Sequence, residues 1–181
     1  MNNLYKNEYK KTGIDTLIEQ RSMSQIIAAT IKTGIIKSNV FAMFAGLSMA
    51  LYVNGLNPFA HVWDIVAAFI GSFLVIGAAG TFNNVYDMDI DALMDRTKSR
   101  PTVVGDISKS AAIWLGIIMA IAGLGILWSA SMYAALFGFL GLFFYVGPYT
   151  MWTKRTTVYN TEVGSISGAF PPLIGWGAVS S

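Results

Sequence analysis

The sequence contains no cysteine and very little charge. Charged residues make up 12% of its 181 residues, whereas hydrophobic residues make up 54%. Without cysteine, the chain can form neither disulfides nor cysteine-based metal sites. Soluble domains average about a quarter charged residues, so this chain has too little polar surface to cover a water-soluble body. Its 18 glycines are typical of membrane helices, which tolerate glycine more readily than soluble helices do.

The N-terminal region also lacks the apolar core of a signal peptide. Its first 25 residues include Lys6, Lys10, Lys11 and Arg21 but no small-residue cleavage site. We therefore expect residues 1–31 to form a polar cytoplasmic tail with no role beyond topology, and residues 32–181 to form a membrane domain.

Five stretches are long and apolar enough, or nearly so, to cross a bilayer, which takes about 20 mostly apolar residues. They cover residues 34–53, 65–82, 111–129, 132–149 and 161–180. The fifth carries Glu162 and the pair Pro171-Pro172. Proline inside a span is tolerated where neighbouring groups satisfy the freed backbone, so we expect a broken or kinked helix there. The prediction is an all-α, multi-pass transmembrane bundle.

The basic residues predict the orientation of this bundle. All twelve Lys and Arg fall in or beside the N-terminal tail, the second-to-third connection and the fourth-to-fifth connection, whereas residues 54–61 and 129–131 contain none. Basic loops are retained on the cytoplasmic side. We therefore expect a protein of the cell (inner) membrane with a cytoplasmic N-terminus.

A polar motif directly follows the second apolar stretch. Four of its residues recur at every fourth position: Asn83, Asp87, Asp91 and Asp95. Residues four apart lie on one face of a helix, so we expect an acidic face. Like charges at this spacing destabilise an exposed helix by roughly a few tenths of a kcal/mol per pair. Helix stability gives no reason for the pattern, whereas a bound divalent cation would make it favourable.

One alternative for this motif is a solvated face whose acids pair with Arg96, Lys98 and Arg100. Asn83 favours a functional site, because polar groups at the membrane edge are costly and usually functional. Carboxylates with an amide and no His or Cys form a hard oxygen site, which suits Mg²⁺ shared with substrate phosphates. The sequence thus predicts Asn83, Asp87 and Asp91 as metal ligands. The single histidine, His61, lies in the opposite connection and is a poor ligand candidate.

Such a metal could hold a diphosphate and neutralise it as its C–O bond breaks. The spacing Asn83-x3-Asp87-x3-Asp91 resembles the first aspartate-rich motif of the UbiA prenyltransferase superfamily. The run 87–101, with its Asp-Arg-Thr-Lys-Ser-Arg-Pro ending, resembles the protoheme IX farnesyltransferase (haem O synthase) branch. So does the block 149–176, which contains Lys-Arg, Gly-Ala, Pro-Pro and Gly-Trp pairs; residues 32–39 are a weaker echo. The resemblance covers nearly all of the chain after the tail.

By this resemblance, the reaction is transfer of a farnesyl group from farnesyl diphosphate to a vinyl group of haem b, giving haem O. Mg²⁺ is the implied cofactor, haem b is a substrate, and Asn83, Asp87 and Asp91 would be the catalytic metal site. The implied substrate-binding residues are Lys154, Arg155, Arg96, Arg100 and Asn160. Two alternatives stay open here. The Lys154-Arg155 pair could serve only to set the membrane orientation, and Arg96 and Arg100 could contact haem propionates or lipid phosphates instead of diphosphate.

Members of this family continue with further membrane helices and a second aspartate-rich motif. The resemblance therefore implies that C-terminal spans are missing, and we expect residues 1–181 alone not to turn over. Two alternatives stay open: a UbiA-type transferase with a quinone precursor or chlorophyllide as acceptor, and a non-catalytic membrane subunit or cation transporter. The lipid bilayer is an expected partner and nucleic acid is not. Association with haem A synthase or a terminal oxidase is left unassigned.

Overall fold

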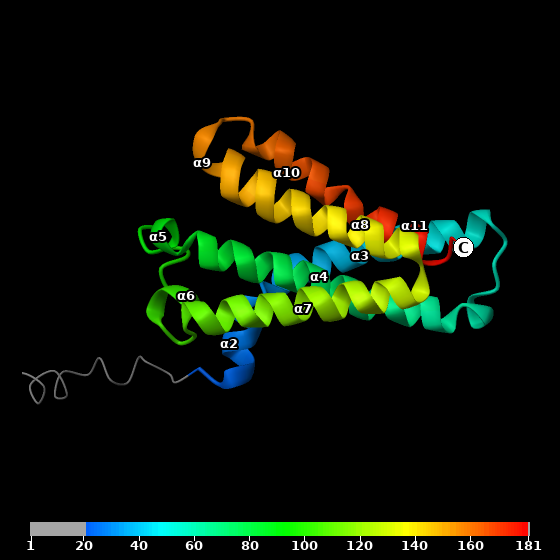
Figure 1. The fold of residues 1–181 in the computed structure, drawn as a ribbon, viewed down its shortest axis with the longest axis horizontal. Helices are drawn as coiled ribbons and strands as arrows, with labels where there is room; N and C mark the ends of the chain where they lie inside the picture. Colours follow the sequence, from blue (N-terminus) through cyan, green and yellow to red (C-terminus); the bar gives the residue numbers. More distant parts are fainter. Residues whose placement is uncertain (1–20, 181) are drawn as a thin grey trace, which may run out of the picture.

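The computed structural model describes residues 21–180, and all of the regular structure there is helical. Figure 1 shows an elongated bundle. The prediction of an all-α fold is thus confirmed. In chain order, the elements are α2 (Met23–Thr30), α3 (Thr33–Val53), η1 (Pro58–Ala60), α4 (Val62–Tyr86), α5 (Met88–Asp91), α6 (Pro101–Val104), α7 (Lys109–Ala130), α8 (Met132–Phe144), η2 (Tyr145–Thr153), α9 (Lys154–Thr156), α10 (Asn160–Gly168) and α11 (Phe170–Ala178).

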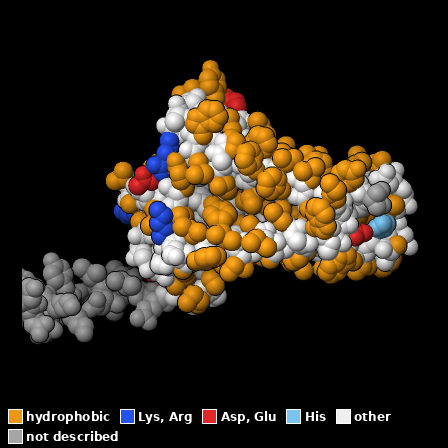
Figure 2. All heavy atoms as spheres, in the orientation of Figure 1, with side chains coloured by type: hydrophobic (Ala, Val, Ile, Leu, Met, Phe, Trp, Pro, Cys, Tyr) orange, Lys and Arg blue, Asp and Glu red, His pale blue; other side chains and the backbone are white. Residues whose placement is uncertain are grey.

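Four helical segments are long and apolar enough to cross a membrane: α3, α4, α7 and the continuous run Met132–Thr156, formed by α8, η2 and α9. Together they contain the first four predicted spans. Apolar side chains cover the flanks of the bundle in Figure 2, and large ones such as Phe41, Ile118 and Phe139 are exposed along them. A continuous apolar surface of this kind is stable only against lipid or a protein partner. The chain is therefore a membrane protein.

The predicted fifth span is broken, as its prolines indicated. It consists of α10 and α11, which are nine residues each and meet at Ala169. Pro171 and Pro172 stand in the first turn of α11, where a missing N–H costs least. Both helices contact α8 and run back along it (Figure 1).

Helix α4 forms the centre of the bundle and packs against α3, α7, α8 and α11. Small residues allow the backbones to approach closely, which is how helices pack in lipid. The closest approach is between α3 and α11: a Cβ on Gly175 would lie 2.0 Å from the Met43 carbonyl oxygen, and one on Gly46 would lie 2.1 Å from that of Pro172. These glycines fix α11 against α3 and thereby one wall of the interior.

The two ends of the bundle differ in charge. The elements α2, α5, α6 and α9 lie toward one end of the bundle (Figure 1), and Figure 2 shows Lys and Arg side chains there. The opposite end carries η1 and a contact between His61 and Asp64 at 2.8 Å, with no Lys or Arg in residues 54–61. Residues 1–20 of the predicted tail lie outside the part of the chain that the structure describes. The last part of the tail forms α2, which Arg21 ties to Asp106 beside α6 at 3.0 Å.

Candidate functional site

The acidic face forms where α4 continues into α5. The Asp87 N–H donates to the Asn83 carbonyl at 3.0 Å, and the Asp91 N–H donates to the Asp87 carbonyl at 2.8 Å, so the helical path persists through the junction. Asn83, Asp87 and Asp91 are 2%, 1% and 5% exposed, whereas the Asp89 side chain is 65% exposed. The three residues therefore share one buried face. The expectation that Asp95 extends this face is wrong, because the chain leaves the helix after Asp91 and the Asp95 side chain is 97% exposed.

Each member of the acidic face is met by a cation from a different part of the chain. The ammonium of Lys154, in α9, donates to Asp87. The guanidinium of Arg100, just before α6, donates to Asp91. A third cation, Lys32, donates to the side-chain oxygen of Asn83. Three cations thus surround two carboxylates, which gives the site an excess of positive charge when all three are protonated.

The amide of Asn83 is held in one orientation. Its Nδ2 donates to the Thr150 hydroxyl at 3.1 Å, and that hydroxyl donates in turn to the Tyr145 carbonyl at 2.7 Å. Both partners belong to η2, a π-helical segment that contains Pro148. π-helical turns often occur at functional sites. Here the wider turn brings the fully buried Thr150 against α4, so that the Asn83 oxygen is left to face the cations.

One buried oxygen of the face has no partner. Asp87 Oδ1 accepts no hydrogen bond, and the Arg155 guanidinium lies 3.9 Å from it. A buried unpaired carboxylate oxygen is costly and fits a place for a cation or water. Residues 21–180 contain no cluster of three or more His, Cys, Asp or Glu that could hold a metal. Two carboxylates and an amide nevertheless fit Mg²⁺, which is commonly held by one or two carboxylates, substrate phosphates and water.

Arg155 lies at the edge of this site and joins two elements. Its guanidinium forms hydrogen bonds of 2.7 and 2.9 Å to the Asp89 carboxylate and one of 2.8 Å to the Tyr86 carbonyl, and it stacks 4.4 Å over the Tyr86 ring. The hydrogen bond from Arg155 lowers the pKa of Asp89. These contacts attach α9 to the end of α4 and so place Lys154 beside Asp87.

Two predicted residues lie apart from the acidic face. Arg96 is exposed in the turn after α5. Asn160 begins α10, where its side-chain oxygen accepts a hydrogen bond from Thr161 at 3.1 Å. Among the described residues, no hydrogen bond or ion pair joins either residue to Asn83, Asp87 or Asp91.

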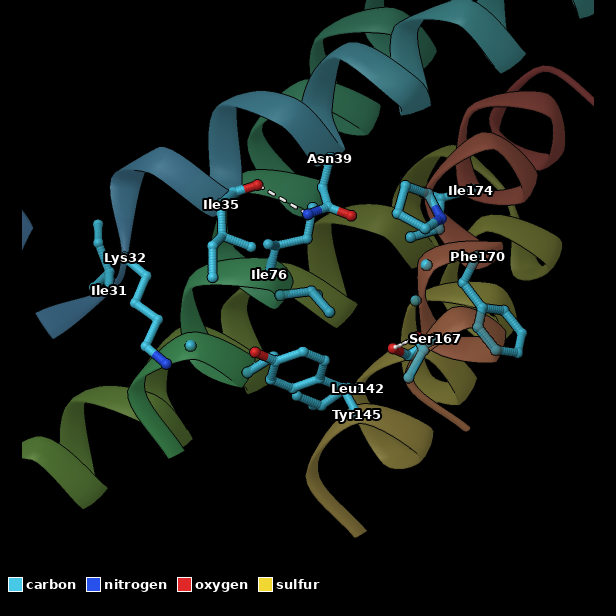
Figure 3. Close-up of a pocket in the computed structure, with 18 residues that line it drawn as sticks. Ile31, Lys32, Ile35, Asn39, Ile76, Leu142, Tyr145, Ser167, Phe170 and Ile174 are labelled. Carbon is cyan, nitrogen blue, oxygen red and sulfur yellow. Dashed lines mark hydrogen bonds between the residues drawn. The ribbon is translucent and has the colours of Figure 1, made fainter. Parts of the chain in front are cut away.

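A cavity of about 190 Å³ opens beside the acidic face, between α3, α4, α8, α10 and α11. Figure 3 shows it extending from Lys32 on one side to Phe170 and Ile174 on the other. Aliphatic side chains and glycines form most of its wall, and the polar ends of Lys32 and Tyr145 lie toward the same side (Figure 3). The cavity therefore has an apolar body and, at Lys32, a cationic end whose ammonium contacts Asn83 of the acidic face.

Lys32 is the site residue that sequence reasoning missed. It stood only at the start of the weaker motif 32–39, and nothing in its spacing connects it with Asn83. Burial, followed by the nearby charges of Arg100 and Lys154, lowers the pKa of Lys32 to about 7. An anion bound beside it would favour the protonated form.

Comparison with known proteins agrees with these features. The chain matches the UbiA prenyltransferase family over residues 39–181. It is 62% identical to protoheme IX farnesyltransferase 1 of Bacillus cytotoxicus, over 88% of this chain and 52% of that protein. It is 60% identical to the protoheme IX farnesyltransferase of Shouchella clausii, over 89% of this chain and 52% of that protein. It is 47% identical to protoheme IX farnesyltransferase 2 of Bacillus subtilis, over 93% of this chain and 55% of that protein. The chain thus spans about half the length of the curated relatives it matches. No solved structure matches it.

Proposed function

This chain belongs to the UbiA prenyltransferase family, and we propose that the protein transfers a farnesyl group from farnesyl diphosphate to a vinyl group of haem b, giving haem O. One observation carries the proposal. Three oxygen-bearing side chains, Asn83, Asp87 and Asp91, are buried on one helix face, each is met by a cation, and the face adjoins an apolar cavity. An anionic head with a long apolar tail fits this combination.

Residues of both charges would hold the diphosphate head. Asp87, Asp91 and the Asn83 oxygen would bind Mg²⁺, which supplies charge neutralisation to the leaving diphosphate. Lys154 and Arg100 are already held beside these ligands and would donate charge-assisted hydrogen bonds to diphosphate oxygens. The unpartnered Asp87 Oδ1 supports a cation at this place. Arg155 would act mainly by positioning Lys154.

The cavity would receive the prenyl tail. When the C1–O bond breaks, its electron pair leaves with the diphosphate and an allylic cation remains, which water would quench. Residues of α3, α4, α8, α10 and α11 line the cavity, and apolar walls of this kind would limit the access of water to the cation, a recognised role of closed active sites. Asn160 begins α10, whose Gly164 and Gly168 form part of the wall, and is proposed to line this region more remotely.

The assignment of haem b as the acceptor rests on the names of the relatives and on the resemblance of residues 87–101 and 149–176 to the haem O synthase branch. We assign no residue as a ligand of the haem iron. The exposed Arg96 is proposed to meet either the propionates or lipid phosphates at the membrane surface. A cation transporter is a poorer fit, because the acidic face lies at the end of the bundle and its carboxylates are paired with cations.

We also propose that the basic end of the bundle faces the cytoplasm, where a soluble diphosphate is available. The clustering of Lys and Arg at one end supports this orientation. A reporter fused after Lys98 should be cytoplasmic and one fused after Ser129 should lie outside. The reverse result would separate the acidic face from its substrate and contradict the proposal.

The activity can be tested in a chimera in which this chain replaces the matching half of the Bacillus cytotoxicus relative. Purified chimera would be supplied with Mg²⁺, farnesyl diphosphate and one of three acceptors: haem b, a quinone precursor or chlorophyllide. Mass spectrometry should find a product, haem O, with haem b alone. Prenylation of another acceptor in preference to haem b would replace the proposed acceptor, and an inactive chimera beside an active parent would contradict the proposed function.

A further inference from the structure

Lys32 has an unusual backbone conformation. It lies between α2 and α3 with φ 58° and ψ 59°, and among the described residues it is the only one other than glycine with a positive φ. This left-handed region is unfavourable for a residue with a Cβ, and residues held there often belong to functional sites. A glycine would meet the same turn without strain, so the turn by itself does not explain a lysine.

The turn is seated against α4 one helical turn before the acidic face. A Cβ on Gly80 would lie 2.8 Å from the Ile31 carbonyl oxygen and 3.4 Å from the Lys32 Cβ. Because Gly80 lacks a side chain, the backbone of the turn can lie directly on α4. The Lys32 side chain then reaches Asn83, three residues further along the helix.

The Lys32 ammonium is a cation without an acidic partner of its own. Among residues 21–180, its hydrogen bond is to the neutral amide oxygen of Asn83, and the carboxylates of Asp87 and Asp91 are taken by Lys154 and Arg100. An ammonium has three donors, and the charge of Lys32, which is partly withdrawn from water, would be stabilised by a counter-ion. Lys32 also lines one end of the cavity (Figure 3).

We propose that Lys32 binds the diphosphate of the prenyl donor directly, at the junction between the acidic face and the apolar cavity. This inference rests on the proposed function and adds a residue to its binding site. At that junction Lys32 donates hydrogen bonds to oxygens near the C1–O bond, which gain charge as the bond breaks. Lys154 and Arg100 hold the head from the other side, where the carboxylates fix them.

A purely structural lysine would behave differently, and three substitutions separate the two roles. Lys32→Met removes the charge and keeps the stem. Lys32→Arg keeps the charge. Lys32→Gly removes both the side chain and the backbone strain. Lys37→Met is the matched control, since Lys37 is exposed on the first turns of α3.

The test measures binding of inorganic pyrophosphate with Mg²⁺ to the purified chimera by calorimetry, together with the unfolding temperature. We expect Lys32→Met and Lys32→Gly to weaken binding about 10- to 100-fold, the range for a hydrogen bond between charged groups, while Lys32→Arg retains part of it and Lys37→Met binds like the wild type. Lys32→Gly should unfold at the wild-type temperature or above, because strain is removed, so lost binding cannot be attributed to misfolding. Wild-type affinity in Lys32→Met or Lys32→Gly would overturn the inference.

Asp87→Asn shows which proposal has failed. If Asp87→Asn abolishes binding and Lys32→Met does not weaken it, the inference about Lys32 is wrong and the proposed function stands. If the wild type does not bind pyrophosphate with Mg²⁺, or Asp87→Asn binds as tightly as the wild type, the proposed diphosphate site is wrong and the inference falls with it.

Discussion

Replacing Lys154 by methionine should change the affinities for Mg²⁺ and for diphosphate in opposite directions. In the structure the Lys154 ammonium occupies the place beside Asp87 that a metal ion would share. Methionine keeps most of the side-chain length and removes the charge. The freed carboxylate should then bind Mg²⁺ more tightly on its own. Diphosphate should bind less tightly, because it loses one of its donors.

The sizes of both effects follow from the burial of the pair. Asp87 is 1% exposed and the Lys154 side chain is 31% exposed, so the contact is partly screened. A hydrogen bond to a charged group contributes about 1.5–3 kcal/mol, which corresponds to about 10- to 100-fold in affinity. We expect diphosphate binding to weaken within this range and the affinity for Mg²⁺ alone to rise about 10-fold. Removing one partner of a buried pair is also destabilising, so the variant should unfold at a lower temperature without Mg²⁺ and recover when Mg²⁺ is added.

Lys98→Met is the matched control. Lys98 forms an ion pair with Asp95, but the side chains are 60% and 97% exposed, and exposed pairs contribute little. Calorimetry with Mg²⁺ alone, and with pyrophosphate at saturating Mg²⁺, would measure both affinities. If both change in the same direction in Lys154→Met, or if Lys98→Met reproduces the effects, Lys154 and Mg²⁺ do not share Asp87.

Three further predictions follow from the site and its packing. Asp87→Asn should abolish haem O formation by the chimera, whereas Asp89→Asn, on the exposed side of the helix, should reduce it less than 10-fold; equal losses would contradict the buried face. Gly175→Ala should lower the unfolding temperature, because its methyl group would lie 2.0 Å from an α3 carbonyl and such overpacking costs about 1–3 kcal/mol. Gly125→Ala, whose methyl group would meet nothing within 4 Å, should leave the unfolding temperature unchanged. An equal decrease in both variants would mean that α3 and α11 do not pack as described. Chelation of divalent cations should abolish pyrophosphate binding and leave the wild-type fold intact, and binding that survives chelation would exclude the metal.

The helical parts of the site could be predicted because they depend on local periodicity. Asn83, Asp87 and Asp91 share a face since the i→i−4 hydrogen bonds continue through Asp87. The broken fifth span could be predicted from Pro171 and Pro172 for the same local reason. Asp95 shows the limit of this reasoning, because the sequence spacing continues after the helix has ended.

Contacts between distant segments could not be predicted in this way. Lys32 reaches Asn83 only because the turn adopts a left-handed conformation and Gly80 leaves room for it. Arg100 was predicted among four possible cations, but no pattern in the sequence distinguishes it from Arg96, which the structure leaves exposed. Tertiary packing makes these choices, and a single sequence does not contain the distances.

The central claim is that the acidic face of α4 and α5 binds diphosphate through Mg²⁺. The most direct test is calorimetric titration of the purified chimera with farnesyl diphosphate, with and without Mg²⁺, in its unsubstituted form and with Asp87→Asn. We predict that Mg²⁺ tightens wild-type binding at least about 10-fold, as expected when a metal joins carboxylates to phosphate, and that Asp87→Asn removes this dependence. Binding that is equally tight without Mg²⁺, or a Mg²⁺ dependence that persists in Asp87→Asn, would contradict the claim.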